Sequence, residues 1–192
     1  MNGIDYTVAN HLSKSAELIK TLKSYETEDI SKLMGLSSNL AFLNFERYQS
    51  WKKPTKPSAD ARQAVFAFQG DVYQGLEAAT MKKGDLKFAQ KHLRILSGLY
   101  GVLKPLDLMA PYRLEMGTKL ATKKHDDLYG FWKDTLTADI NEQLAEQKDS
   151  TLINLASNEY FNALNKKDIA GDIISPVFKD FKNGDYKIIS FF

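Results

Sequence analysis

The sequence predicts a mixed α/β (α+β) fold, a single domain with a helix-rich N-terminal part and a strand-rich C-terminal part. From Thr7 to Ser24, apolar residues recur every three or four positions, which is typical of an amphipathic helix. After residue 150, β-branched and aromatic residues stand in short runs between turn residues, which favours strands. With 192 residues, 43% of them hydrophobic, the chain is long enough for one packed core, so we expect one domain over residues 1–192.

Helical patterns follow the first one through much of the chain. A short apolar run, Ala64–Phe68, predicts a buried strand. Asp71 is then placed to cap a helix that continues to Leu76. Further helices are expected over Glu26–Leu33, Ser37–Ser50, Gly84–Leu96 and Asp127–Leu144.

The sequence predicts strands in the last part of the chain. Runs of strand-forming residues cover Thr151–Ala156, Ile173–Phe178 and Tyr186–Phe191. Asn183-Gly184 is a strong hairpin signal between the last two runs. Because the chain stops on a predicted strand and enters almost directly into a helix, we expect a chain that is shortened at both ends.

The composition excludes several classes of site. No cysteine is present, which rules out disulfides, zinc–thiolate centres, iron–sulfur clusters and cysteine nucleophiles. With only three histidines, a histidine-rich metal cage is not expected, and the sequence points to neither a metal nor a cofactor. No stretch has the length of a membrane span and no secretory signal is visible, so we expect a cytoplasmic protein with no membrane partner. The formal net charge is +2, so anion binding requires a local patch.

The segment from Met81 to Lys104 contains such a patch, with six basic residues and one acidic residue, Asp85. Gly98 and Gly101 lie within it, and a tight hairpin between two short helices would leave backbone N–H groups free for a phosphate. This arrangement resembles a helix-hairpin-helix, a turn that binds the DNA backbone. That motif separates its glycines by one residue, whereas this chain has two between them. The alternative is a structural turn beside a solvated basic helix.

Two other motifs carry reactive side chains. Asp71 stands between glycines at a predicted strand–helix junction, where it acts as a helix cap or as a general base or ligand. Arg113 and Glu115 share one face of an extended segment, so they form a buried ion pair, or Arg113 clamps a phosphate. No phosphate-loop or dinucleotide fingerprint is present.

Two polar clusters remain. Ser157 or Asn158 is placed to cap a short helix whose start would suit an anion. Arg47, Tyr48 and Trp51 close a predicted helix, where they either stack on nucleic-acid bases or form the edge of the core.

Four phrases, in this order, resemble the YaaA family of peroxide-stress proteins. The phrases are GDVYQGL, HLRILSGLYGVLKPLDLMAPYRLEMG, NLASNEYF and KNGDYKIISF. The resemblance runs from about Asp5 to Phe191. Against the family pattern, this chain lacks an N-terminal apolar strand and a C-terminal basic segment, so its cleft is expected to be less positive.

The resemblance implies a cytoplasmic bacterial protein that limits hydrogen peroxide damage by keeping unincorporated iron low. It also implies a positively charged cleft and a helix-hairpin-helix-like element that binds DNA, mostly without sequence preference. The oligomeric state is not indicated. Carried over by motif, the DNA-binding residues are Lys87, Lys91, Arg94, Gly98, Leu99, Tyr100, Gly101 and Lys104. The residues expected to line the cleft are Arg47, Asp71, Tyr73, Arg113, Glu115 and Asn158.

DNA binding as the main function favours a protein that is not an enzyme. Two other functions are alternatives to it. The alternative is an enzyme that acts on a nucleotide or a damaged base, with Asp71 or Glu115 as acid–base groups. Direct iron sequestration ranks lowest, since no Glu-x-x-His pair of the ferritin type is present.

Overall fold

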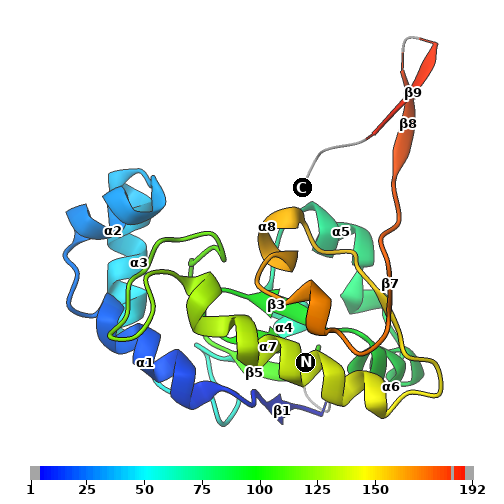
Figure 1. Cartoon of the computed structure of the whole chain (residues 1–192). Helices are drawn as coiled ribbons and strands as arrows, with labels where there is room; N and C mark the ends of the chain where they lie inside the picture. Colours follow the sequence, from blue (N-terminus) through cyan, green and yellow to red (C-terminus); the bar gives the residue numbers. More distant parts are fainter. Residues whose placement is uncertain (1–4, 183, 189–192) are drawn as a thin grey trace. The chain divides into compact units, whose positions relative to one another are not determined.

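The computed structural model describes residues 5–182 and 184–188, and Figure 1 shows the course of the chain. Helices and short strands occur throughout the described residues, so the predicted mixed α/β class is confirmed. The chain forms two compact units, Met1–Leu128 and Tyr129–Phe192. The single domain over residues 1–192 stays a prediction.

Three helices follow one another in the first unit, as the apolar spacing predicts. Leu18 and Leu22, one helical turn apart, are fully buried. At the start of the second helix the backbone N–H of Glu26 donates to Asp29 Oδ2 (3.1 Å), and Gly35, with φ 62°, ends that helix. The helices are α1 (Leu12–Leu22), α2 (Thr27–Met34) and α3 (Ser38–Ser50).

A three-stranded sheet joins distant parts of the first unit. Strand β5 (Asp107–Met109) lies between β1 (Thr7–Val8), which is parallel to it, and β2 (Arg62–Gln63), which is antiparallel. The expectation that the first helix starts at Thr7 is therefore wrong, because β1 is extended against β5 and α1 begins later. Asp107 is 4% exposed and accepts hydrogen bonds from Thr7 Oγ1 (2.6 Å) and the Lys104 backbone N–H (2.7 Å).

The predicted buried strand Ala64–Phe68 is instead one helical turn, α4 (Ala64–Ala67). Ala64 and Val65 are buried, and the backbone N–H of Val65 donates to the Pro105 carbonyl oxygen (2.9 Å). A short apolar run does not distinguish a buried strand from a buried helical turn. The elements that follow are α5 (Asp71–Leu76), the 3-10 turn η1 (Ala78–Thr80) and α6 (Lys83–His92).

Gly98 and Gly101 lie in a β-hairpin, and the expected turn between two helices is not formed there. Strand β3 (Ile95–Ser97) pairs antiparallel with β4 (Gly101–Leu103), and α6 stops before β3. A Cβ on Gly98 would lie 2.2 Å from the carbonyl oxygen of Leu114, and Gly101 has φ 75°. The glycines permit a close backbone approach and a left-handed residue, and they do not open a helix start. This corrects the helix-hairpin-helix expectation.

The second unit contains one long helix, whose residues Trp132 and Leu136 are buried one turn apart. The side chain of Asn141 on this helix donates to the Asp168 carbonyl oxygen (2.7 Å) and accepts from the Ala170 N–H (2.8 Å). These two bonds hold the later segment along the helix. The elements are α7 (Leu128–Ala145), β6 (Thr151–Ile153), α8 (Asn158–Phe161), η2 (Lys166–Asp168) and β7 (Asp172–Ile174), with β6 parallel to β7.

Two local predictions in the second unit are confirmed. Ser157 is the N-cap of α8, and its Oγ accepts the backbone N–H of Tyr160 at 3.5 Å. The hairpin predicted around Gly184 is present and pairs β8 (Lys179–Lys182) with β9 (Asp185–Ile188), and Gly184 has φ 85°. Its first strand is not the predicted run Ile173–Phe178, because β7 ends at Ile174 and residues 175–178 lie in no strand. Asn183 of the hairpin turn and the predicted strand residues 189–191 lie outside the described residues.

Candidate nucleic-acid interface

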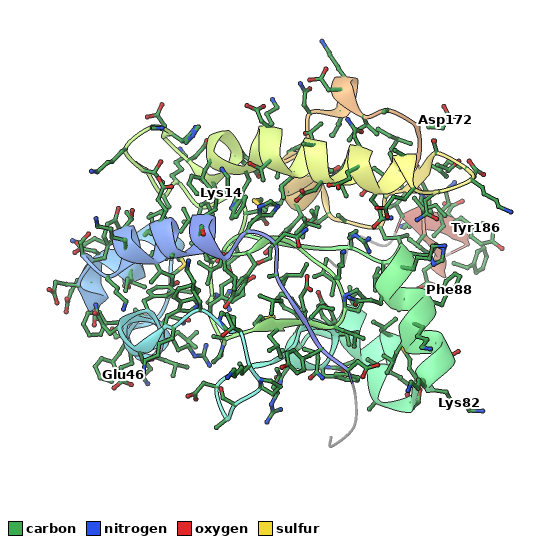
Figure 2. All side chains as sticks on the ribbon, turned by 90° about the horizontal axis from the view of Figure 1, so that it is seen from below. Lys14, Glu46, Lys82, Phe88, Asp172 and Tyr186 are labelled. Atoms are coloured by element: carbon green, nitrogen blue, oxygen red, sulfur yellow. The ribbon has the colours of Figure 1, made fainter. Side chains whose placement is uncertain are left out.

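Helix α6 presents a row of lysines on its outer face. Its inner face packs Leu86 into a small apolar cluster with Leu106. Because the helix repeats every 3.6 residues, intervening positions point outward, and Lys83, Lys87 and Lys91 are exposed. These residues, four apart, form the lysine row. Figure 2 shows this helix, with Lys82 and Phe88 labelled.

The other charged residues of the basic segment are partly engaged within the protein. Asp85 Oδ2 accepts the backbone N–H of Lys82 (2.9 Å), so the one carboxylate of the segment caps the start of α6. Arg94 is half-buried, and its Nη1 donates to the carbonyl oxygens of Gln90 (3.1 Å) and Leu93 (2.7 Å). The exposed positive charge of the segment therefore lies mainly on the lysines.

The hairpin part of the expected DNA-binding set lies inside the first unit. Residues 98–101 are buried, and the side chains of Leu99 and Tyr100 have no exposed surface. The Tyr100 hydroxyl oxygen accepts hydrogen bonds from Trp51 Nε1 (3.0 Å) and the Ala110 backbone N–H (2.9 Å). Burial raises the pKa of Tyr100 to about 12. A buried residue offers no surface to a phosphate, so these positions serve packing.

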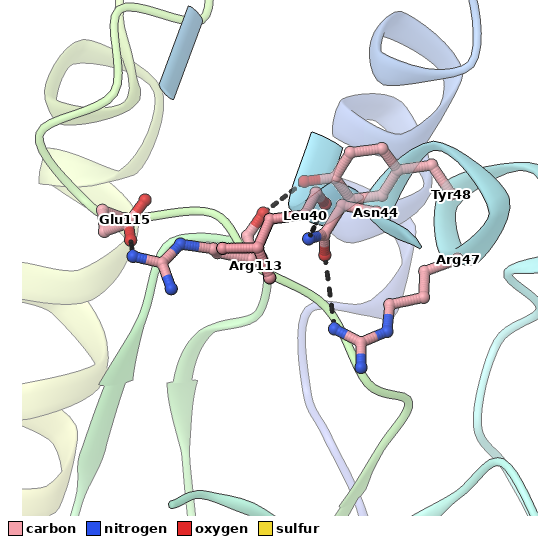
Figure 3. Close-up of polar contacts among 6 residues, drawn as sticks. All are labelled: Leu40, Asn44, Arg47, Tyr48, Arg113 and Glu115. Atoms are coloured by element: carbon pink, nitrogen blue, oxygen red, sulfur yellow. Dashed lines mark hydrogen bonds and ion pairs between the residues drawn. The ribbon is translucent and has the colours of Figure 1, made fainter. Parts of the chain in front are cut away.

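Arg113 and Glu115 form the expected ion pair (Figure 3). Arg113 Nη2 lies 2.7 Å from Glu115 Oε1, but the two side chains are 49% and 36% exposed, so the pair is not buried. The hydroxyl of Tyr48 donates to the carbonyl oxygen of Arg113, and burial, together with the charge of Glu115, raises the pKa of Tyr48. Arg47 donates from Nη1 to Asn44 Oδ1 (3.4 Å). Helix α3 thus contacts the segment of Arg113 and Glu115 through Tyr48, whereas Arg47 bonds within its own helix.

The remaining expected cleft residues are spread over several elements. Gly70 is the N-cap of α5, and Asp71 is the exposed first residue of that helix, which corrects its expected capping role. Tyr73 stacks on Phe68 with ring centroids 5.2 Å apart, and burial raises the pKa of Tyr73 to about 12. Asn158 is exposed at the start of α8 in the second unit.

The two candidate acid–base residues of the enzyme alternative, Asp71 and Glu115, lie on different segments, since Asp71 begins α5 and Glu115 follows β5. Among the described residues, no hydrogen bond or ion pair joins Asp71 to Glu115. Glu115 is paired with Arg113 instead. The enzyme alternative stays a prediction.

Two aromatic residues on α6 were missed by the sequence reasoning. Phe88 is 67% exposed, and its ring stacks on that of His92. The spacing of Phe88 and His92 could have predicted the stack, since rings four residues apart on a helix are neighbours. By contrast, Tyr48 and Trp51 are 1% and 9% exposed, which confirms the alternative that they form the edge of the core.

Residues 5–182 and 184–188 contain neither a candidate metal site nor a candidate membrane span. Within these ranges, no group of three or more histidine, cysteine, aspartate or glutamate side chains is placed to hold a metal ion. No helix in the same ranges combines the length and the apolar character needed to cross a membrane.

The fold and the lysine row define a mixed α/β protein with a localised polycationic surface. The family model described as peroxide stress protein YaaA matches residues 2–192, and the chain belongs to this family. A UPF0246 protein of Teredinibacter turnerae is 54% identical over 186 residues, which are 97% of this chain and 72% of the relative. UPF0246 proteins of Saccharophagus degradans and Hahella chejuensis are each 54% identical, over 100% and 96% of this chain and 75% and 72% of theirs.

Proposed function

We propose that this protein binds the phosphate backbone of DNA through the lysine row of α6, together with Lys82. The observation that carries the proposal is the concentration of exposed positive charge on one helix of a nearly neutral chain. Lysine–phosphate contacts release counterions and carry no sequence information, so binding is expected to be mostly independent of sequence. Arg94 and Lys104, the other basic residues of the segment, are half-buried. Residues 98–101, which follow α6 in the chain, are buried and offer no surface to DNA. Their part in the proposal is limited to packing.

DNA binding is consistent with a role in peroxide stress, the condition that the family description names. Iron(II) reduces hydrogen peroxide to hydroxide and a hydroxyl radical, and the radical attacks DNA near the point where it forms. The proposal therefore extends to protection of DNA and to low unincorporated iron, the role that the family resemblance implies. A strain carrying Lys87→Ala/Lys91→Ala is then expected to be as sensitive to hydrogen peroxide as a strain that lacks the protein. Wild-type resistance in the variant strain would show that stress protection does not depend on DNA binding by these lysines.

The direct test is a salt titration of binding to a fluorescent DNA duplex. Four lysine–phosphate contacts correspond to a log–log slope of about −4, and each lost contact lowers its magnitude by about 1. Lys87→Ala/Lys91→Ala is expected to weaken binding and to bring the slope to about −2.

The chain offers a control with the same change in net charge. Lys20 and Lys23 are exposed on and just after α1, which lies away from α6 in both Figure 1 and Figure 2. Lys20→Ala/Lys23→Ala is expected to leave affinity and slope unchanged. An affinity that does not respond to salt, or an equal loss in both double variants, would contradict the proposal.

A further inference from the structure

An exposed pair of stacked rings lies beside the lysine row. The Phe88 side chain is 67% exposed, and its ring centroid is 4.1 Å from that of His92, with the ring planes inclined by 26° (Figure 2). His92 Nδ1 lies 2.9 Å from the Phe88 carbonyl oxygen, so the imidazole is held against its own helix turn. A ring as exposed as that of Phe88 contributes little to the core. It is available to a ligand, with His92 supporting it.

The residue one helical turn before Phe88 is Gly84, which has no side chain to cover the ring. Residues four apart are neighbours on a helix, and side chains lean toward the helix N-terminus, so the Phe88 ring leans toward Gly84. A Cβ added at Gly84 would meet nothing within 4 Å. The ring is therefore supported on one side by His92 and open toward the turn of Gly84.

The charge around the rings indicates what kind of ligand fits. Lys91 lies three residues after Phe88, so the two are neighbours on the exposed side of α6, and Lys87 lies one turn before Lys91. Asp85, the acidic residue of this helix, accepts the backbone N–H of Lys82. An aromatic surface bordered by lysines suits a polyanion with planar groups better than an apolar protein partner. Single-stranded nucleic acid combines both features.

We propose that Phe88, backed by His92, is a stacking platform for an unpaired base of single-stranded DNA whose phosphates follow Lys87 and Lys91. This inference deepens the proposed function and rests on it. Bases within a duplex already stack on their neighbours, so the platform adds affinity only where a strand is unpaired. Every base has a stacking face, so the platform tolerates different sequences.

The test compares two probes, a short fluorescent single-stranded oligodeoxythymidylate and a duplex, bound to the whole protein. Phe88→Leu keeps an apolar helix-forming residue but removes the ring. It is expected to weaken binding of the single strand about tenfold, on the scale of one base–aromatic stack, and to leave duplex binding within about twofold. An abasic strand of equal length should bind the wild type and Phe88→Leu alike. Circular dichroism establishes that each variant is folded.

Gly84 offers a second variant that leaves the ring in place. Gly84→Leu fills the open turn beside Phe88 and is expected to reduce single-strand binding as Phe88→Leu does, whereas Gly84→Ala, with only a methyl group, should bind like the wild type. Unchanged single-strand binding by both Phe88→Leu and Gly84→Leu would overturn the platform. If duplex binding is lost in Lys87→Ala/Lys91→Ala but kept in Phe88→Leu, the lysine row binds the DNA backbone independently of the Phe88 ring. If the wild type binds no duplex, the proposed function fails instead.

Discussion

At the scale of single residues, Tyr100 uses one hydroxyl group to join separate segments of the first unit. Its oxygen accepts Trp51 Nε1 at 3.0 Å and the Ala110 backbone N–H at 2.9 Å, and the residue is fully buried. Tyr100→Phe leaves two donors without their acceptor. We expect the free energy of unfolding in urea to fall by about 1–3 kcal/mol. Tyr186→Phe, at a side chain that is 72% exposed, is the control and should stay within about 0.5 kcal/mol of the wild type. Equal effects of the two substitutions would contradict this role of Tyr100.

The same burial predicts a loss of stability in alkali. Burial raises the pKa values of Tyr100 and Tyr73 from 10.0 to about 12, while the unfolded chain releases these protons near the ordinary value. The folded state then binds more protons than the unfolded state between these values. The stabilising contribution is therefore fully present below pH 10 and is lost as the pH rises toward 12. Urea midpoints measured across this range should fall with pH, and constant midpoints would show that the two tyrosines ionise as exposed groups do.

At the scale of elements, the β3–β4 hairpin depends on the absence of a side chain at Gly98. A Cβ there would lie 2.2 Å from the Leu114 carbonyl oxygen, which is backbone and cannot move aside cheaply. We expect Gly98→Ala to lower the free energy of unfolding by about 1–3 kcal/mol, the usual cost of overpacking. Gly75 lies within α5 and has open space around it, so Gly75→Ala should raise stability by about 0.5–1 kcal/mol. If both variants were stabilised, Gly98 would not be a packing residue.

The elements that the sequence predicts correctly are those specified by local chemistry. The helices α1, α2, α3 and α7 follow from apolar spacing within one segment, and the last hairpin follows from its Asn-Gly turn. Strands β3 and β4 were missed because they are short and mostly buried, which leaves no polar alternation to read. Strand β1 pairs with β5 across about half the chain, and no local pattern encodes such a partner.

The candidate site was predictable to a similar degree. The positive charge of α6 is a property of composition, and the pairing of Arg113 with Glu115 follows from their spacing. Burial is not local, so the sequence did not reveal that Gly98 and Gly101 are enclosed. Glycines serve a phosphate-binding turn and a close backbone approach equally well, and only tertiary packing distinguishes the two.

At the scale of the whole molecule, charge is unevenly distributed. The segment from Met81 to Lys104 carries +5 and the whole chain +2, so the remainder carries −3. Exposed charges farther apart than about 10 Å are largely screened at moderate salt. A polyanion bound at α6 should therefore respond to the local excess and hardly to the net charge.

This uneven distribution gives a test in which net charge and local charge disagree. Glu17 and Glu28 are exposed on α1 and α2, away from α6 in both views, and Glu17→Gln/Glu28→Gln raises the net charge from +2 to +4. If counterion release at the lysine row governs binding, this variant keeps the wild-type salt slope for duplex DNA, and its affinity changes by less than about twofold at moderate salt. A steeper slope in the glutamine variant would mean that DNA contacts a wider surface than α6, because only added phosphate contacts release added counterions.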